Sequence, residues 1–398
     1  MIKTLKDIDV ENKKVILRVD YNVSINDGII ASTKRIDESF KTLDYLISKN
    51  AKVIILSHFG KVKIEADKER NTLKPVFDYI SGLGKYNIRF CPTPMGSELD
   101  SMVNTLRSGE LLLVENTRFL DLEGNLESGC DIQLSMYWAS LADVYIDDAF
   151  GSMHRKHASI TGIPKYLPSA VGFLVENEIN NIDAILKNPE HPFVAIMGGA
   201  KLDDKINLMY SLLEKCDYIL LGGGIANTFL MASGYNVGAS LVSKDAILTA
   251  KNIMLEFKDK IILQKDVITS PSYSDTIYEH KIIQQIEVDD VIGDIGSAAI
   301  ENYKRIIESA KTIFINGTVG MYEKLEFGNG TQEILNIVAN ARAKKIVGGG
   351  DALSALAKFK LTDKMDFVST GGGATLQYIA DGTLPGIEVV NSSNENLN

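Results

Sequence analysis

Short apolar runs that end in a glycine or polar turn and then lead into a helical pattern recur along this 398-residue chain. In the first half such runs predict strands at 15–19, 53–56, 88–91, 111–114 and 144–146, with a less regular sixth at 170–173. Helical spacing lies between them, for example at 36–48, 73–80 and 134–142. Strands that alternate with helices predict a parallel sheet with helices on both faces.

The second half repeats this unit with glycine after each expected strand. These glycines lie at 198–199, 222–224, 317, 348–350 and 371–373. On one sheet they would form a rim of backbone amides, which suits a nucleotide whose phosphates lie at helix starts. Neither G-x-x-x-x-G-K-[ST] nor G-x-G-x-x-G occurs, so the P-loop and the dinucleotide fingerprint do not apply.

A helical pattern over 173–188 separates the two halves. We therefore predict an N-terminal lobe over 1–172, a linking helix over 173–188 and a C-terminal lobe over 189–385. The predicted fold class is α/β, with a parallel sheet flanked by helices in each lobe. In such sheets ligands bind beyond the carboxyl ends of the strands.

Composition narrows the function classes. A formal net charge of −10 argues against a nucleic-acid partner. The three cysteines form no C-x-x-C pair, which argues against a disulfide framework or a zinc site and fits a reducing cytosol. The charged N-terminal residues do not resemble a signal peptide. Glycines and polar residues interrupt the uncharged window 218–243, so we expect a cytoplasmic protein without a membrane span.

Polar and cationic residues follow the expected strands of the first half. They are Asp20, Asn22, Arg35, His58, Lys61, Arg118 and Arg155. Cations that follow several parallel strands converge at one edge of the sheet, and arginine donates two hydrogen bonds to a carboxylate or phosphate. The pattern predicts a site for a multiply charged anion. Taken alone, His58 is also compatible with a packed core histidine.

Structural roles are the alternative for some of these residues. Arg118 could pair with Glu115, and Arg155 could pair with Asp148, in ion pairs that touch no ligand. Asp20 could orient a neighbouring arginine instead of contacting the ligand. These readings stay open at this point.

The stretch 193–205 is an apolar run, two glycines and an expected helix start. Lys201 and Lys205 are four residues apart and would share one helical face, where a phosphate could lie between them. Asp351 follows the glycines at 348–350 and is either a helix N-cap or a magnesium ligand between nucleotide phosphates. Glu323 is either an exposed acid or a partner of a ribose hydroxyl.

Together these motifs resemble phosphoglycerate kinases, along essentially the whole chain. The first four matching stretches are Arg18-Val-Asp-Tyr-Asn-Val, Leu56-Ser-His-Phe-Gly, Glu115-Asn-Thr-Arg-Phe and Asp148-Ala-Phe-Gly-Ser-Met-His-Arg-Lys-His-Ala-Ser. The next four are Gly198-Gly-Ala-Lys-Leu-Asp-Asp-Lys-Ile, Gly222-Gly-Gly-Ile-Ala-Asn-Thr-Phe, Gly348-Gly-Gly-Asp and Ser369-Thr-Gly-Gly-Gly-Ala-Thr-Leu. Their occurrence in this order is highly specific.

The resemblance implies two Rossmann-like lobes around a cleft and reversible phosphoryl transfer between 1,3-bisphosphoglycerate and Mg-ADP in glycolysis. It implies that the N-terminal lobe binds 3-phosphoglycerate, that the C-terminal lobe binds Mg-ADP or Mg-ATP, and that the tail 386–398 returns to the first lobe. It also implies a monomer with small-molecule substrates.

The resemblance assigns roles residue by residue. Substrate-binding residues would be Asp20, Asn22, Arg35, His58, Lys61, Arg118 and Arg155. Catalytic residues that stabilise the transferring group would be Arg35, Arg155 and Lys205. Nucleotide-binding residues would be Lys201, Lys205, Gly222, Glu323, Gly349, Gly350, Asp351 and Ala352, with Asp351 as the Mg²⁺ ligand.

Some positions depart from the family pattern. Lys61 stands where arginine is common, Ser24 and Thr318 replace prolines, and Ala352 replaces a hydroxyl residue. These departures support the alternative of a phospho-ligand-binding homologue with reduced or lost turnover. A nicotinamide dehydrogenase on similar lobes is disfavoured because G-x-G-x-x-G is missing.

Overall fold

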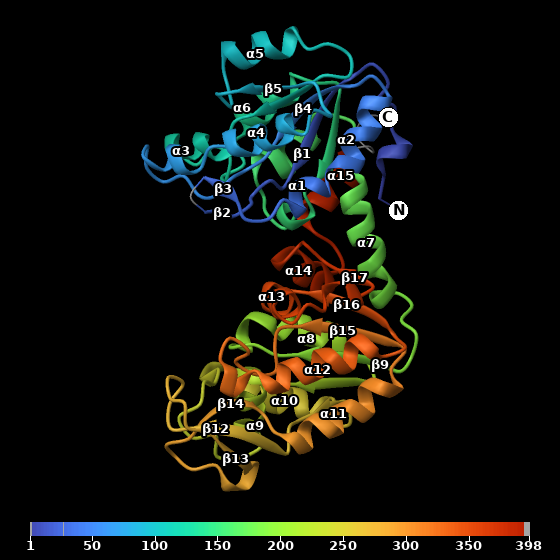
Figure 1. Ribbon diagram of the computed structural model, residues 1–398. Coiled ribbons are helices and arrows are strands. Elements are labelled where there is room, and N and C mark those ends of the chain that lie inside the picture. The colour runs from blue at the N-terminus through green and yellow to red at the C-terminus, as the bar shows by residue number, and fades with distance from the viewer. Residues whose placement is uncertain (1, 27, 394–398) are drawn as a thin grey trace. The chain divides into compact units, whose positions relative to one another are not determined.

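The computed structural model describes residues 2–26 and 28–393, and Figure 1 shows the arrangement of their helices and strands. The first sheet is built of parallel strands in the order β5-β6-β4-β1-β7-β8. Their bounds are β1 Lys14–Val19, β4 Lys52–Leu56, β5 Ile88–Cys91, β6 Leu111–Val114, β7 Val144–Asp148 and β8 Ser169–Val171. Short strands β2 (Ile25–Asn26) and β3 (Ile29–Ile30) form a separate antiparallel pair.

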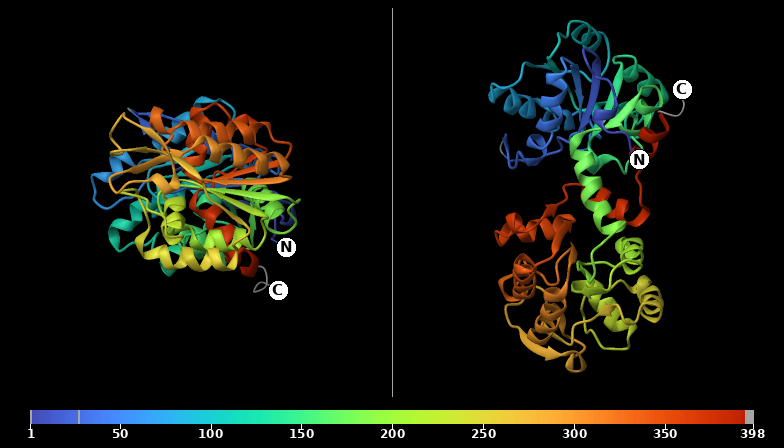
Figure 2. Two further views of the ribbon diagram at one scale, coloured as in Figure 1. Left: turned by 90° about the horizontal axis from the view of Figure 1, so that it is seen from below. Right: turned by 90° about the vertical axis from the view of Figure 1, so that its right-hand side faces the viewer.

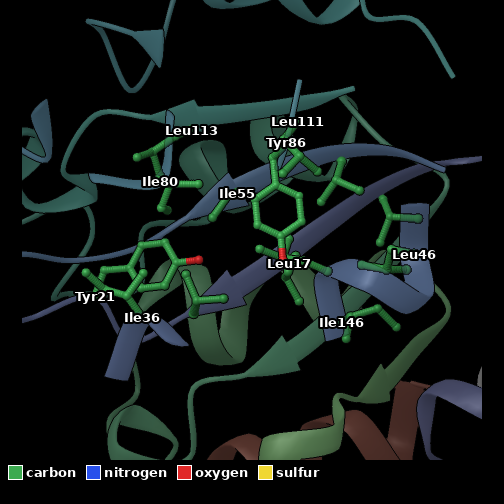
Figure 3. Close-up of a cluster of buried hydrophobic side chains, with 14 of the residues drawn as sticks. Leu17, Tyr21, Ile36, Leu46, Ile55, Ile80, Tyr86, Leu111, Leu113 and Ile146 are labelled. Atoms are coloured by element: carbon green, nitrogen blue, oxygen red, sulfur yellow. The ribbon is translucent and has the colours of Figure 1, made fainter. Parts of the chain in front are cut away.

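Helices cover this sheet and complete its core. They are α1 Lys34–Asp37, α2 Phe40–Ser48, α3 Asp67–Arg70, α4 Lys74–Gly82, α5 Ser97–Asn104 and α6 Ile132–Ala139. Figure 3 shows how strand residues such as Leu17, Ile55 and Ile146 meet the helix residues Leu46 and Ile80 in one apolar cluster. The strands are continuous apolar runs because both of their faces are buried.

Two elements of this half differ from the sequence-based expectation. The helix expected over 36–48 is interrupted between α1 and α2, where Ser39 donates a side-chain hydrogen bond to the carbonyl oxygen of Ile36 (2.7 Å). The sixth strand ends at Val171, and helix α7 (Phe173–Leu186) follows. The helix begins there because the buried carboxylate of Asp148 accepts the backbone N–H of Leu174 (2.9 Å).

The second large sheet is also parallel, with the order β11-β10-β9-β15-β16-β17. Its strands are β9 Phe193–Met197, β10 Tyr218–Leu221, β11 Ile261–Ile262, β15 Thr312–Asn316, β16 Lys344–Gly348 and β17 Phe367–Val368. The strands that end at the glycine turns all belong to this sheet. A smaller antiparallel sheet has the order β13-β12-β14, with β12 Asp266–Ser270, β13 Glu279–Ile282 and β14 Val291–Ile295.

Helices lie on both faces of the second large sheet, as the left view of Figure 2 shows. They are α8 Ile206–Leu213, α9 Gly223–Ala232, α10 Ile247–Glu256, α11 Ser297–Ser309, α12 Asn329–Asn340, α13 Gly350–Lys358 and α14 Gly373–Asp381. The window 218–243 forms β10, α9 and the loop that follows. No helix in the described part of the chain is long and apolar enough to cross a membrane.

The expected helix start just after Gly199 is wrong. Helix α8 begins only at Ile206, after a 3₁₀ turn at Asp203–Lys205, so Lys201 does not share a helical face with Lys205. Gly199 has a φ of +113°, outside the right-handed helical region. In addition, the N–H of the buried Leu202 is bound to the hydroxyl of Ser243 (2.9 Å), which is 41 residues away in sequence.

The chain groups into two units, Met1–Ile179 with Thr383–Asn398, and Asn180–Gly382. The boundary between the units falls within α7, whereas the sequence-based prediction treats all of 173–188 as a linker. The C-terminal segment of the first unit starts at 383, whereas the predicted tail starts at 386. Helix α15 (Pro385–Ser393) packs in the first unit, where Gly386 donates its N–H to the carbonyl oxygen of Met153 (2.9 Å). Residues 394–398 of the predicted tail lie outside the described residues.

Candidate active site

The first unit brings polar residues together beyond the carboxyl ends of β1 and β4. Nη1 of Arg35, in α1, donates to Oδ2 of Asp20 (3.2 Å) and to the carbonyl oxygen of Asn22 (3.1 Å). The side-chain oxygen of Asn22 accepts the N–H of Gly60 (2.9 Å) in the turn after β4. Asp20 therefore orients a neighbouring arginine, as one of the sequence-based alternatives proposes.

Arginines gather around these residues. Burial lowers the pKa of Arg155, and the positive charges of Arg118, Arg18 and Arg35 lower it further, against the opposing effect of Asp20. Burial alone would raise the pKa of Asp20, but the effects of His58, Arg35 and Arg18 outweigh it, and the net shift is downward. A chain with a net charge of −10 thus concentrates mutually repelling guanidinium groups at one sheet edge. Such a cluster is suited to a multiply charged anion.

Both ion pairs considered as structural alternatives are wrong. Arg118 pairs with Asp121 through its Nε (2.7 Å), while Glu115 binds backbone N–H groups at the start of α4 and at its own strand end. Asp148 binds the start of α7, and Nε of Arg155 lies 3.4 Å from Nε2 of the adjacent His154. Lys61 is an exposed residue in the turn after β4.

His58 is almost completely enclosed, with 2% of its surface exposed. Its Nδ1 lies 3.2 Å from Nη2 of Arg18, a residue of β1 that has no exposed surface. Burial is the main cause that lowers the pKa of His58 to about 3. Sequence reasoning missed Arg18 as a site residue, although an arginine inside an apolar strand was a visible signal.

The second unit holds a cavity of about 350 Å³ next to the glycine turns. It is lined by Gly199, Ala200, Gly223, Gly224, Asn227, Leu241, Tyr273, Ile292, Gly293, Thr318, Gly320, Met321, Glu323 and Asp351. The turns touch closely: a Cβ on Gly198 would lie 1.9 Å from the carbonyl oxygen of Thr318, and one on Gly224 would lie 2.2 Å from that of Ala200. Glycine is required there because neighbouring backbone occupies the space of a side chain.

Lys205 lies at these turns with its Nζ donating to the carbonyl oxygen of Gly198 (2.7 Å). Burial lowers the pKa of Lys205, and the carboxylates of Asp351 and Asp204 partly oppose this effect. Asp351 is exposed and is the second residue of α13, whose N-cap is Gly349. The N-cap reading of Asp351 is therefore wrong, and the carboxylate remains available at the cavity.

The predicted nucleotide residues occupy different surroundings. Glu323 and Asp351 line the cavity, Lys205 and Gly350 lie at the adjacent turn and helix start, and Lys201 is exposed between β9 and α8. The remaining three pack against protein: Gly222 against Val319, Gly349 against Asn316 and Ala352 in the core.

The apolar cavity walls Leu241, Tyr273 and Met321 were missed by sequence reasoning. Their apolar side chains carry no local signal of a binding role. Leu241 and Tyr273, 32 residues apart in sequence, are joined by a hydrogen bond from the Leu241 N–H to the tyrosine hydroxyl (2.7 Å). Within the described residues, no group of three or more His, Cys, Asp or Glu side chains could hold a metal ion without a ligand's help.

Comparison with known proteins identifies the family. The family model described as phosphoglycerate kinase matches residues 5–382. The chain belongs to the phosphoglycerate kinase family. It is 43% identical to the phosphoglycerate kinase of Enterococcus faecalis over 392 residues, which cover 98% of this chain and 99% of that protein. It is 43% identical to the phosphoglycerate kinase of Listeria innocua over 387 residues, which cover 97% and 98% of the two chains.

Solved structures agree with this membership. The phosphoglycerate kinase of Coxiella burnetii is 33% identical, with a TM-score of 0.88 over 99% of this chain and 100% of that chain. The phosphoglycerate kinase of Pyrococcus horikoshii is 29% identical, with a TM-score of 0.82 over the same shares. The predicted α/β fold with two helix-flanked parallel sheets is confirmed, as is the expectation of a phosphotransferase of this family. The alternative of a homologue without turnover is not favoured.

Proposed function

We propose that this chain catalyses reversible phosphoryl transfer between 1,3-bisphosphoglycerate and Mg-ADP. In this proposal the arginine cluster of the first unit is the substrate half-site, and the glycine-lined cavity of the second unit is the nucleotide half-site. The observation that carries the assignment of roles is the cluster of mutually repelling arginines in an acidic chain. Holding such charges together opposes folding, so a bound anion is the partner that would relieve their repulsion.

The substrate half-site takes the glycerate carboxylate and phosphate. We assign this role to Asn22, Arg35, His58, Lys61, Arg118 and Arg155, with Asp20 as a supporting residue of the same half-site. Arg118 and Arg155 supply planar donors that match the oxygens of these groups. Asp20 does not bind the anion directly in this assignment, because its Oδ2 already fixes the guanidinium of Arg35.

The nucleotide half-site is the glycine-lined cavity. Leu241, Tyr273 and Met321 give it an apolar wall for the base, and Glu323 supplies a carboxylate for a ribose hydroxyl. The phosphates would lie at the start of α13, where Gly349 and Gly350 expose backbone N–H groups at the positive end of the helix dipole. We include Lys201, Gly222 and Ala352 among the proposed nucleotide-binding residues because they lie at or next to these turns.

The donor set near Asp351 fits Mg²⁺. Mg²⁺ in kinase sites is held by one or two carboxylates together with phosphate oxygens and waters, and Asp351 offers one exposed carboxylate at the cavity. When bound, the ion would neutralise charge on the nucleotide phosphates. Asp351 also acts on Lys205 electrostatically, so the carboxylate and the ammonium lie within reach of the same ligand.

Arg35, Arg155 and Lys205 are the proposed catalytic residues. Phosphoryl transfer needs in-line placement and positive charge around the three equatorial oxygens rather than covalent chemistry from the protein. Their cations supply this charge when the two half-sites act on the same phosphoryl group. Exclusion of water at that moment prevents hydrolysis of the acyl phosphate.

The test is a coupled spectrophotometric assay with 3-phosphoglycerate and Mg-ATP, paired with calorimetric titration of Mg-ADP. We expect turnover in the assay and binding in the titration. Binding without turnover would support the homologue that has lost activity. Failure of both would contradict the proposal.

We further propose that the chain works as a monomer in the cytoplasm, without nucleic-acid or membrane partners. The net charge of −10 and the absence of a disulfide among the described residues support this proposal. Size-exclusion chromatography with light scattering would show a mass near 43.7 kDa. A mass of twice that value would contradict it.

A further inference from the structure

Arg18 is a wholly buried arginine in a central strand, and each of its three side-chain nitrogens contacts a protein group. Its Nε donates to the hydroxyl of Ser159 (2.9 Å), its Nη1 donates to the carbonyl oxygen of Val19, and its Nη2 lies 3.2 Å from Nδ1 of His58. A buried charge without partners is strongly unfavourable. The position of the guanidinium is therefore set by these contacts and not by solvent.

Ser159, the partner of Nε, is itself held by the buried Glu127. The backbone N–H of Ser159 donates to Oε2 of Glu127 (2.9 Å), and the Ser159 hydroxyl donates to the other carboxylate oxygen. The hydroxyl of Tyr145 donates to Oδ2 of Asp147 (3.0 Å). Burial raises the pKa of both acids, and the charge of Arg18 opposes this in each case. Two enclosed carboxylates thus interact electrostatically with the guanidinium, and neither forms a direct ion pair with it.

The contact between Arg18 and His58 decides where the imidazole carries its proton. A guanidinium has only donors, so the ring nitrogen that faces it must accept. Nδ1 of His58 is then unprotonated, and the proton of the neutral ring is on Nε2. An imidazolium would place an N–H of His58 against an N–H of Arg18.

Nε2 of His58 is the edge that a ligand can reach. Among the residues that the structure describes, no group lies within hydrogen-bond distance of Nε2. The charged and titratable groups that act on the ring come from the elements around it: Arg18 in β1, Asp20 after β1, and Arg155 and His157 after β7. Burial, the positive charges of Arg18 and Arg155, and the nearby His157 together hold the pKa of His58 far below its usual range, against Asp20.

We infer that Arg18 is a positioning residue that locks His58 as the neutral Nε2–H tautomer, so that the ring offers one hydrogen-bond donor to the anionic substrate. The inference rests on the proposed function for the identity of that substrate. We place Arg18 behind His58 and not on the anion, because its side chain has no exposed surface and each of its three nitrogens contacts a protein group. The positive charge that binds the substrate comes from the arginines at the rim, and His58 adds a donor without adding charge.

The inference has a consequence for pH dependence. A free histidine becomes charged as the pH falls through about 6.5, and a charged donor would bind an anion more tightly. A locked neutral tautomer gives no such gain, so the contribution of His58 to the KM for 3-phosphoglycerate stays constant between about pH 5 and about pH 8. In Arg18→Met the tautomer is no longer fixed, so the hydrogen bond from Nε2 weakens, while burial still keeps the ring neutral.

The most direct test observes the unaltered protein and uses a variant only to assign the signal. Long-range ¹H–¹⁵N correlation spectra of the full chain with labelled histidine distinguish the two neutral tautomers and the imidazolium, and His58→Gln assigns the signal. We expect the Nε2–H pattern for His58 at about pH 6. An Nδ1–H tautomer or an imidazolium at that pH would overturn the inference, whether or not the protein shows kinase activity.

Kinetics of two variants provide a second test. We expect Arg18→Met to raise the KM for 3-phosphoglycerate by about tenfold, the value of one hydrogen bond to a charged group, and to leave kcat nearly unchanged. Arg18→Lys keeps a cationic donor to Nδ1 and is expected to restore KM. A folded Arg18→Met variant with an unchanged KM would refute the positioning role. Failure of wild-type protein to bind 3-phosphoglycerate in calorimetry would instead refute the proposed function.

Discussion

Replacement of Lys205 by alanine tests the part of the site that has the clearest geometry. The ammonium is buried beside the glycine turns, 2.7 Å from the carbonyl oxygen of Gly198 and within the electrostatic reach of Asp351. An enclosed cation interacts with developing charge more strongly than one in water. Removal of one such preorganised group costs about 3–4 kcal/mol of transition-state stabilisation, so we expect kcat to fall by about 10²–10³-fold.

The assay for Lys205→Ala is the coupled reaction with 3-phosphoglycerate and Mg-ATP, with calorimetry of Mg-ADP beside it. We expect the affinity for Mg-ADP to change little, because the glycine turns and Asp351 are untouched. Lys251→Ala on α10 is the matched control, since it removes an exposed lysine of the same unit. Near-normal kcat in Lys205→Ala would refute the catalytic role of this residue.

Thermal unfolding separates a catalytic loss from misfolding. The pKa of Lys205 is lowered in the folded state, which means that burial of its charge opposes folding at neutral pH. Removal of the ammonium is therefore expected to leave Tm unchanged or higher. A large drop in Tm would show that the loss of activity reports instability instead.

Three further predictions concern binding and stability. Arg118→Ala should raise the KM for 3-phosphoglycerate by about tenfold or more in steady-state kinetics, and an unchanged KM would remove this residue from the site. Gly198→Ala should destabilise the fold by about 1–3 kcal/mol or more in urea unfolding. Gly373→Ala is the control, because a Cβ added there would meet no atom within 4 Å. Equal urea midpoints for the two variants would contradict this prediction. Burial raises the pKa of Asp148 to about 7, so the contribution of this residue to the free energy of unfolding falls as the pH rises from about 4 to about 7. Asp148→Asn should therefore flatten the dependence of the unfolding free energy on pH over this range. An unchanged pH dependence would refute the raised pKa of Asp148.

The strands could be predicted from sequence because each is an apolar run buried on both faces of a parallel sheet. Runs such as 111–114 leave no other element that fits their length and glycine-bounded ends. The convergence of cations after these strands followed from the same topology, since parallel strands end at one edge.

Features that depend on contacts distant in sequence could not be predicted. The delayed start of α8 depends on a hydrogen bond between Leu202 and Ser243, and no local pattern contains that contact. The apolar wall of the cavity uses Leu241 and Tyr273 from loops that only tertiary packing brings together. Arg18 stands out in its apolar strand, but its hydrogen bond to Ser159, 141 positions away, and its proposed support of His58 depend on contacts that the strand does not contain.

Direct transfer of a labelled phosphoryl group tests the central claim most directly. Full-length protein would be mixed with γ-labelled Mg-ATP and 3-phosphoglycerate in a single turnover, and the labelled products would be separated. We predict that the label appears in 1,3-bisphosphoglycerate, and only when both substrates are present. Label that appears mainly as inorganic phosphate, or that stays on ATP, would contradict the proposed cooperation of the arginine cluster with the glycine-lined cavity.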